Sequence, residues 1–168
     1  ASGNDGVNTL LGNDAANTLT GGDGNDLLNG LTGNDILIGG TGDDRYAFIG
    51  NFGVDHIVEN DAAVGNTDTL LFSSIGTAST DQLWFRHVAD DLEISVIGTA
   101  NKVIVDDWYL GTQHHVEKIQ AASKVLLDTK VENLVNAMAA FTPPTSGQTT
   151  LPPAYATALA PVIAANWQ

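Results

Sequence analysis

A repeat of nine residues covers the first third of the chain and constrains its fold more than any other feature. From Gly3 the sequence divides into GNDGVNTLL, GNDAANTLT, GGDGNDLLN, GLTGNDILI and GGTGDDRYA. Glycine comes first in each unit and recurs at the fourth position in all but one, where Ala15 stands. Another unit, GNFGVDHIV, begins at Gly50 after the additional residues Phe48 and Ile49. A short constant period predicts a coil in which every unit repeats one local structure and stacks on its neighbours.

Two positions of the unit carry side chains with different tasks. The sixth position reads Asn8, Asn17, Asp26, Asp35, Asp44 and Asp55 along the chain. The eighth position reads Leu10, Leu19, Leu28, Leu37, Tyr46 and Ile57. We expect the end of each unit to form a short strand of three residues, whose middle side chain points inward because strand side chains alternate. The residues before it form a tight loop, in which glycine tolerates the positive φ angles that the turn requires.

Stacking of these loops predicts shared metal ions between acidic side chains. Two units complete one coil with strands on opposite faces, so loops two units apart lie on the same edge. The expected pairs are Asp26 with Asp44, Asp35 with Asp55, and Asp44 onward with Asp68 in the stretch GNTDTL. Carboxylate and carbonyl oxygens are the ligands of Ca²⁺, which takes about six to eight of them. The sequence therefore predicts calcium sites along both edges of the coil.

Asparagine replaces aspartate at the sixth position of the first two units. Asn8 with Asp26 and Asn17 with Asp35 are candidate pairs too, but an amide carries no charge, so we expect weaker sites there. The loop positions expected to provide calcium ligands are Asn8, Asn17, Gly21, Asp23, Gly24, Asp26, Gly30, Thr32, Gly33, Asp35, Gly39, Thr41, Gly42, Asp44, Gly50, Gly53, Asp55 and Asp68. A flexible glycine-rich linker is the alternative interpretation, and the joint periodicity of several positions argues against it.

Charge and composition exclude several functions. The chain has 20 acidic and 6 basic residues, and its net charge of −14 repels nucleic acid and anionic lipid while attracting cations. Residues 1–68 contain 11 acidic residues and a single base, Arg45. No cysteine is present, so neither a disulfide frame nor a thiolate metal site is possible. No apolar run reaches transmembrane length, no signal peptide is visible, and the start at Ala1 indicates a piece of a longer protein.

These motifs resemble the RTX (repeats-in-toxin) family, whose nonapeptide GGxGxD with a following large apolar residue is matched best by residues 21–29 and 39–47. Residues 81–120 are similar to the haemolysin-type calcium-binding related region, and the order of segments looks like the last repeat block of the adenylate cyclase toxins. The resemblance implies an all-β fold: a parallel β-roll of nonapeptide repeats with Ca²⁺ between its loops. It also implies export by the type I secretion machinery, directed by an uncleaved signal in the final several dozen residues.

The remainder of the chain is expected to close the roll. Residues 67–127 contain short runs of alternating apolar and polar side chains, which predict strands covering the open end of the coil. Residues 128–141 predict an amphipathic helix that begins with a capping box of Thr129 and Glu132. One or two short helices are thus expected beside the sheets. The predicted parts are a calcium-binding β-roll over residues 1–66, a capping region over residues 67–141, and a proline-rich linker and tail with the secretion signal over residues 142–168.

The sequence contains no catalytic constellation that we recognise. His114, His115 and Glu117 could be imagined as a zinc site, but adjacent strand residues point to opposite faces and no further ligand is nearby in sequence. The aromatic residues Trp84, Phe85, Trp108 and Tyr109 are interpreted as the core of the cap rather than as a ligand-stacking surface. We expect a non-catalytic, secreted or cell-surface module, monomeric as a fragment. The alternatives are part of a surface adhesin that binds cells, glycans or ice, and the C-terminal module of a secreted hydrolase.

Overall fold

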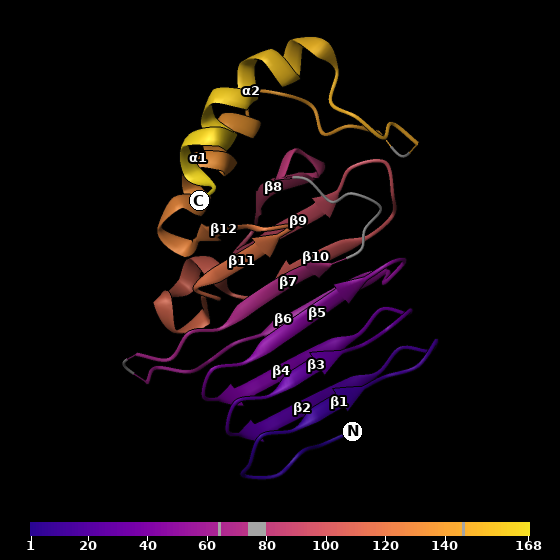
Figure 1. Ribbon diagram of the computed structural model, residues 1–168, viewed down its shortest axis with the longest axis vertical. Helices are drawn as coiled ribbons and strands as arrows, with labels where there is room; N and C mark the ends of the chain where they lie inside the picture. Colours follow the sequence, from indigo (N-terminus) through magenta and orange to yellow (C-terminus); the bar gives the residue numbers. More distant parts are fainter. Residues whose placement is uncertain (64, 74–79, 146) are drawn as a thin grey trace.

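The architecture is that of two facing sheets with helices at one end (Figure 1). A computed structural model describes residues 1–63, 65–73, 80–145 and 147–168. In this part of the chain each sheet has six strands, in the order β1-β3-β5-β7-β11-β12 for one and β2-β4-β6-β10-β9-β8 for the other. The repeats provide the strands at one end of both sheets, and the segments after them provide the rest.

The repeats wind into a parallel β-roll, which confirms the predicted fold. One sheet contains β1 (Thr9–Leu11), β3 (Leu27–Asn29), β5 (Arg45–Ile49) and β7 (Thr69–Ser73). The facing sheet contains β2 (Thr18–Asp23), β4 (Ile36–Thr41) and β6 (Val54–Val58). Equivalent positions pair across neighbouring coils, as in Leu10 with Leu28 and Leu19 with Leu37. The strands β2 and β4 have six residues instead of the expected three, because their pairing continues into the loops through Gly22 and Gly40.

The eighth position of the repeat lies inside the roll. Leu19, Leu28, Leu37, Tyr46 and Ile57 are each at most 1% exposed. One large side chain per unit makes a continuous but narrow core. Where the period is interrupted, the inserted Phe48 stacks on Phe72 with ring centroids 5.2 Å apart and contacts Phe52 at 5.1 Å. The insertion therefore adds an aromatic cluster to the core at the end of the repeats.

The segments after the repeats extend both sheets and cover the end of the roll. The strand β10 (Lys102–Val105) pairs in parallel with β6, and β11 (Lys118–Ala121) pairs in parallel with β7. The strands β9 (Asp91–Val96), β8 (Leu83–Val88) and β12 (Lys124–Leu127) then add on in antiparallel pairs. Trp84, Phe85 and Trp108 are buried beneath them, as expected for the core of a cap. Three short 3₁₀ segments, η1 (Thr80–Gln82), η2 (Trp108–Leu110) and η3 (Thr112–His114), connect strands in the described part of this region.

The helix α1 (Asp128–Met138) packs its predicted apolar face on the cap. Its start differs from the prediction, because Thr129 and Glu132 do not form a capping box. Helical structure begins at Asp128, whose Oδ1 accepts the N–H of Thr129 at 2.6 Å, so Thr129 lies inside the first turn. Glu132 instead accepts hydrogen bonds from Tyr109 and Asn136.

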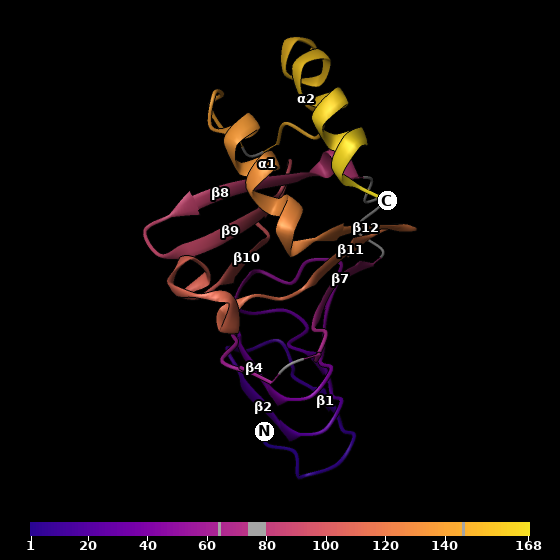
Figure 2. The same ribbon diagram turned by 90° about the vertical axis from the view of Figure 1, so that its left-hand side faces the viewer.

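A second helix, α2 (Pro153–Asn166), lies against α1 (Figure 2). The chain then returns to the sheet, where Trp167 pairs with Leu126 of β12. Gln168 and Val125 exchange two backbone hydrogen bonds of 2.9 Å, and Trp167 is only 3% exposed. The apolar tail is thus packed on the cap. Neither helix, nor any other helix among the described residues, is long and apolar enough to cross a membrane.

Candidate metal centre

One edge of the roll carries a ladder of sixth-position side chains. The N–H of Asn8 donates to Asp26 Oδ1 at 2.7 Å, and the N–H of Asp26 donates to Asp44 Oδ1 at 2.8 Å. The N–H of Asp44 continues the pattern to Asp68 Oδ1 at 2.7 Å. The nine-residue period predicts these same pairs of residues on one edge of the roll. Each carboxylate thus uses one oxygen to hold the backbone of the preceding coil.

The opposite edge carries the same ladder. The N–H of Asn17 donates to Asp35 Oδ1 at 2.8 Å, and the N–H of Asp35 donates to Asp55 Oδ1 at 2.9 Å. Both edges therefore stack as the nine-residue period predicts, although a two-residue insertion precedes the last unit. The arrangement requires the tight loops described above. In them, the fourth-position glycines Gly24, Gly33 and Gly42 have φ values of 114°, 144° and 118°.

A side chain of the cap ends the first ladder and another binds a loop of the opposite edge, and sequence reasoning found neither of them. The N–H of Asp68 donates to Glu117 Oε2 at 2.7 Å, and the N–H of Gly53 donates to Asn101 Oδ1 at 3.1 Å. A usable signal existed for Glu117. It directly precedes β11, just as Asp68 directly precedes β7 and Asp44 directly precedes β5. Glu117 therefore takes the place of a sixth-position acid in a segment without the repeat.

The second carboxylate oxygen of three sixth-position aspartates has no hydrogen-bond partner. Asp26, Asp35 and Asp44 are at most 2% exposed, and their Oδ2 atoms are buried and unpaired. An unpaired buried carboxylate is costly unless a cation or a proton compensates for it. A Cβ atom built on Gly21 would overlap both Asp26 Oδ2 and the carbonyl oxygen of Gly39. Carboxylate and carbonyl oxygens thus converge there, which is the donor set that Ca²⁺ prefers.

Burial also shifts the acidity of these groups. Loss of solvation raises the pKa of Asp44 to about 6 and those of Asp55 and Asp68 to about 7, and neighbouring carboxylates add to each shift. Burial raises the pKa of Asp35 as well. In each case the charged form is disfavoured when no cation is bound. The residues present therefore fit a bound divalent cation.

In the loops with asparagine at the sixth position, the side-chain amide donates hydrogen bonds within its own loop. The Nδ2 of Asn8 donates to the carbonyl of Gly6 within its own loop and to Asn4 Oδ1 at 3.2 Å. The Nδ2 of Asn17 donates to Asn13 Oδ1 at 3.4 Å. Amide hydrogens thus occupy loop oxygens that a cation would otherwise bind. The weaker sites expected in the first two units stay a prediction.

The third-position side chains lie outside the loops. The Thr41 hydroxyl donates to Asp23 Oδ1 at 2.9 Å, and the Thr32 hydroxyl donates to Asp14 Oδ1 at 2.8 Å, both across neighbouring coils. Asp23 and Thr41 are exposed. The structure therefore does not bring these side chains to the sixth-position carboxylates. Ligation by Asp23, Thr32 or Thr41 would have to use their backbone carbonyl oxygens.

The two adjacent histidines do not share a site. His114 belongs to the 3₁₀ segment η3 rather than to a strand, which corrects the expected local structure. Its Nδ1 lies 2.6 Å from the carbonyl oxygen of Glu59. His115 instead stacks on Trp108 with ring centroids 4.0 Å apart and approaches Asp128 at 3.3 Å. The two rings therefore have separate partners on the cap.

Comparison with known proteins matches both parts of the chain. Residues 2–37 and 20–47 match the RTX calcium-binding nonapeptide repeat, and residues 91–122 match the haemolysin-type calcium binding protein related domain. Among solved structures, the extracellular lipase LipA from Serratia marcescens is 23% identical, with a TM-score of 0.34, over 62% of this chain and 18% of its own. This chain therefore corresponds to less than a fifth of that protein.

Proposed function

From the premise that this chain carries RTX calcium-binding repeats and a haemolysin-type calcium-binding related domain, we propose that it is the calcium-dependent folding and export module of a larger secreted protein. Its repeats bind Ca²⁺, and this binding decides whether the β-roll is folded. The chemistry of the module is then ion coordination, and any activity of the whole protein would belong to other segments.

The unpaired oxygens of the sixth-position aspartates carry this proposal. Asp26, Asp35 and Asp44 each direct one oxygen to the neighbouring backbone and keep the other buried without a partner. Without a cation, stacked carboxylates repel one another across the edges of the roll. The apolar core offers one large side chain per unit, which is little to offset the loss of chain entropy. Calcium removes the repulsion, so its binding free energy becomes folding free energy.

The free calcium concentration decides whether the roll is folded or unfolded. Extracellular calcium modules bind with Kd values of about 10⁻⁴–10⁻³ M. With free Ca²⁺ about tenfold above Kd, each ion stabilises the fold by about 1.4 kcal/mol. A few sites acting together then decide folding outside the cell, whereas submicromolar calcium inside the cell contributes almost nothing. The chain would remain unfolded for passage through a type I export channel and fold after it.

The parts of the chain receive separate roles in this proposal. Residues 1–66 together with Asp68 and the strand β7 form the calcium-binding roll, the remainder of residues 67–141 covers its end, and residues 142–168 carry the export signal. The predicted loop positions serve as the ligand set, with Asp26, Asp35, Asp44, Asp55 and Asp68 as the charged members. Likeness of the C-terminal block to that of the adenylate cyclase toxins stays a prediction, as does the choice between a toxin, an adhesin and a hydrolase as the whole protein.

A calcium titration of paired variants tests the proposal. Far-UV circular dichroism would follow the chain from a chelator into millimolar Ca²⁺, with Mg²⁺ as a control ion. Asp44→Asn removes one buried charge and should raise the calcium midpoint about tenfold, equivalent to about 1.4 kcal/mol. Asp43→Asn removes the same charge from the exposed neighbouring position and should leave the midpoint nearly unchanged.

The control is closely matched because Asp43 also accepts a backbone hydrogen bond, from Thr67 at 2.7 Å, which an asparagine oxygen can keep. A chain with the same β-sheet spectrum in chelator and in calcium would refute the proposal. Equal shifts for both variants would show that overall charge, rather than the buried ligand, sets calcium sensitivity.

A further inference from the structure

Glu59 stands where the other units of this edge have glycine. In the register that begins at Gly50, the next unit begins at residue 59, directly after β6. One coil earlier the equivalent residue is Gly39, where a Cβ atom would overlap Asp44 Oδ2 and the Tyr46 hydroxyl. The loop that follows Glu59 is longer, since ten residues separate β6 from β7. A side chain that the repeat elsewhere forbids is therefore accommodated at this position.

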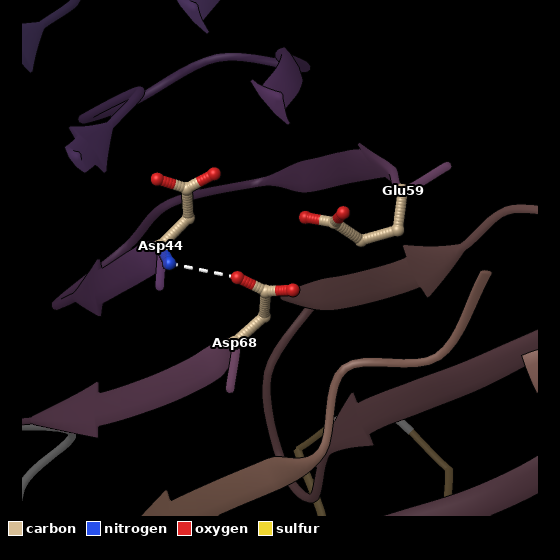
Figure 3. A group of neighbouring side chains, drawn as sticks. All are labelled: Asp44, Glu59 and Asp68. Atoms are coloured by element: carbon tan, nitrogen blue, oxygen red, sulfur yellow. Dashed lines mark hydrogen bonds between the residues drawn. The ribbon is translucent and has the colours of Figure 1, made fainter. Parts of the chain in front are cut away.

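The Glu59 side chain joins two sixth-position acids (Figure 3). Asp44, Glu59 and Asp68 are all buried, and one carboxylate oxygen of each lies within 4.8 Å of the others. The Tyr46 hydroxyl donates to Glu59 Oε1, and the N–H of Asp44 donates to Asp68 Oδ1. Three carboxylates and one phenolic oxygen thus gather at one point in the last coil.

Two oxygens of this cluster have nothing to bind. Asp44 Oδ2 and Glu59 Oε2 are both buried and without a hydrogen-bond partner, and Glu59 is only 2% exposed. None of the ion pairs found among the described residues involves Asp44, Glu59 or Asp68. Burial, reinforced by the nearby charge of Asp68, raises the pKa of Glu59 to about 9. The cluster therefore has the donors of a cation site and no cationic side chain to neutralise it.

We propose that the Glu59 carboxylate is a further ligand of the calcium ion shared by Asp44 and Asp68, at the junction of the roll and the cap, and that no other loop provides such a ligand. The identity of the ion rests on the proposed function. Its donors are all oxygen atoms, three of them from carboxylates, which is a set that Ca²⁺ prefers.

The position of this junction site couples the roll to the cap. The carbonyl oxygen of Glu59 contacts His114 Nδ1 at 2.6 Å, and the N–H of Asp68 donates to Glu117 Oε2 at 2.7 Å. His114 and Glu117 both belong to the cap, whereas Asp44 belongs to the repeats. An ion held by all three carboxylates would therefore tie the last coil to the structure that closes it. Its occupancy would be needed before the cap can support folding of the repeats.

Glu59→Gln tests the junction site, because the amide keeps an oxygen for Tyr46 while it loses the charge. Isothermal titration of the full chain with CaCl₂ should show one fewer bound ion per chain and a higher calcium midpoint of folding. The control is Glu132→Gln on the exposed face of α1, which removes the same charge without touching the cluster. It should bind as many ions as the unsubstituted chain.

A chelator arm separates ligation from a simple packing role. In EDTA with sucrose as stabiliser, which favours compact states, Glu59→Gln should fold at least as well as the unsubstituted chain, because a buried acid has been replaced by a neutral group. An unchanged ion count and midpoint for Glu59→Gln would overturn the junction site. If the unsubstituted chain itself neither bound nor responded to CaCl₂, the proposed function would fail instead, so the two failures are distinguishable.

Discussion

At the scale of single residues, the sixth position of each unit closes its loop in one of two ways. In the first unit, Asn8 donates its own amide hydrogens to loop oxygens, including the carbonyl of Gly6. In the third, Asp26 offers no hydrogen and leaves Oδ2 buried and unpaired. Asn8 Oδ1 accepts the N–H of Asn4 within its own loop, whereas Asp26 Oδ1 accepts the N–H of Asn8 in the preceding coil. The amide of Asn8 therefore uses its atoms within its own loop, whereas the carboxylate of Asp26 bonds the preceding coil and keeps one oxygen for a cation.

Conversion of the first loop should create a stronger ion site. Asn8→Asp places a second carboxylate next to Asp26, so we expect about one additional calcium ion per chain and a lower calcium midpoint. In chelator the same substitution should lower the folded fraction, because it adds like charge to the edge. Asn51→Asp adds a charge at an exposed loop position, and it should change neither the number of bound calcium ions nor the folded fraction in chelator. Calcium binding measured by titration calorimetry checks the count, and no gain in bound ions would contradict the interpretation.

Buried aspartates also predict how pH acts on the chain. The pKa values of Asp44, at about 6, and of Asp55 and Asp68, at about 7, lie above the ordinary value of 3.8. A raised acid pKa means that the folded state binds protons more tightly, so the metal-free fold is most stable at low pH and loses stability as pH rises from about 4 to 7. In chelator, β-structure should therefore increase as pH falls from about 8 to 5.

Protons and calcium compete for the same oxygens, so the calcium midpoint should rise over that range as pH falls. Circular dichroism titrations at several pH values measure both effects. A calcium midpoint independent of pH would show that the carboxylates remain ionised in the metal-free fold.

At the scale of elements, the regularity of the repeat determined how much could be predicted. A constant period converts sequence spacing into spatial register, so the pairing of Asp26 with Asp44 and of Asp35 with Asp55 was predictable from the spacing alone. Glu59 was not predictable, because the period ends before it and the loop after β6 has ten residues, and Glu117 offered only its place directly before a strand as a signal. Their places depend on which cap strand continues which sheet. Alternating apolar patterns predict that strands exist, but they do not specify partners.

The contact between β11 and the roll can be tested through Glu117. Glu117→Ala removes the acceptor for the N–H of Asp68, and a partly buried N–H left unpaired costs about 1–3 kcal/mol. Glu117→Gln keeps an acceptor at the same reach and should cost much less. Denaturant unfolding in saturating calcium measures the difference. Equal losses for the two variants would mean that the charge of Glu117, rather than its hydrogen bond, stabilises the junction.

At the scale of the whole molecule, charge and core are distributed unequally. Residues 1–68 hold 11 of the 20 acidic residues and a single base. The cap instead holds a broad core that includes Trp84, Phe85 and Trp108, together with the apolar face of α1. Electrostatic repulsion is therefore concentrated where the core is narrow. We therefore expect the folding of the repeats to depend on calcium, and the folding of the cap to depend on it only through its contacts with the last coil.

Hydrogen exchange in chelator should reveal this division. Amides of residues 9–58, in β1 to β6, should lose protection when calcium is removed, whereas those of β8, β9 and β12 should keep part of theirs, because the cap strands pair with one another around their own core. Restored calcium should return protection to the coil nearest the cap first, since β10 and β11 provide the edges on which β6 and β7 pair. Exchange measured by mass spectrometry on peptides from each region resolves this order. Simultaneous loss and recovery everywhere would mean that the cap cannot template the roll, and that both fold as a single calcium-dependent unit.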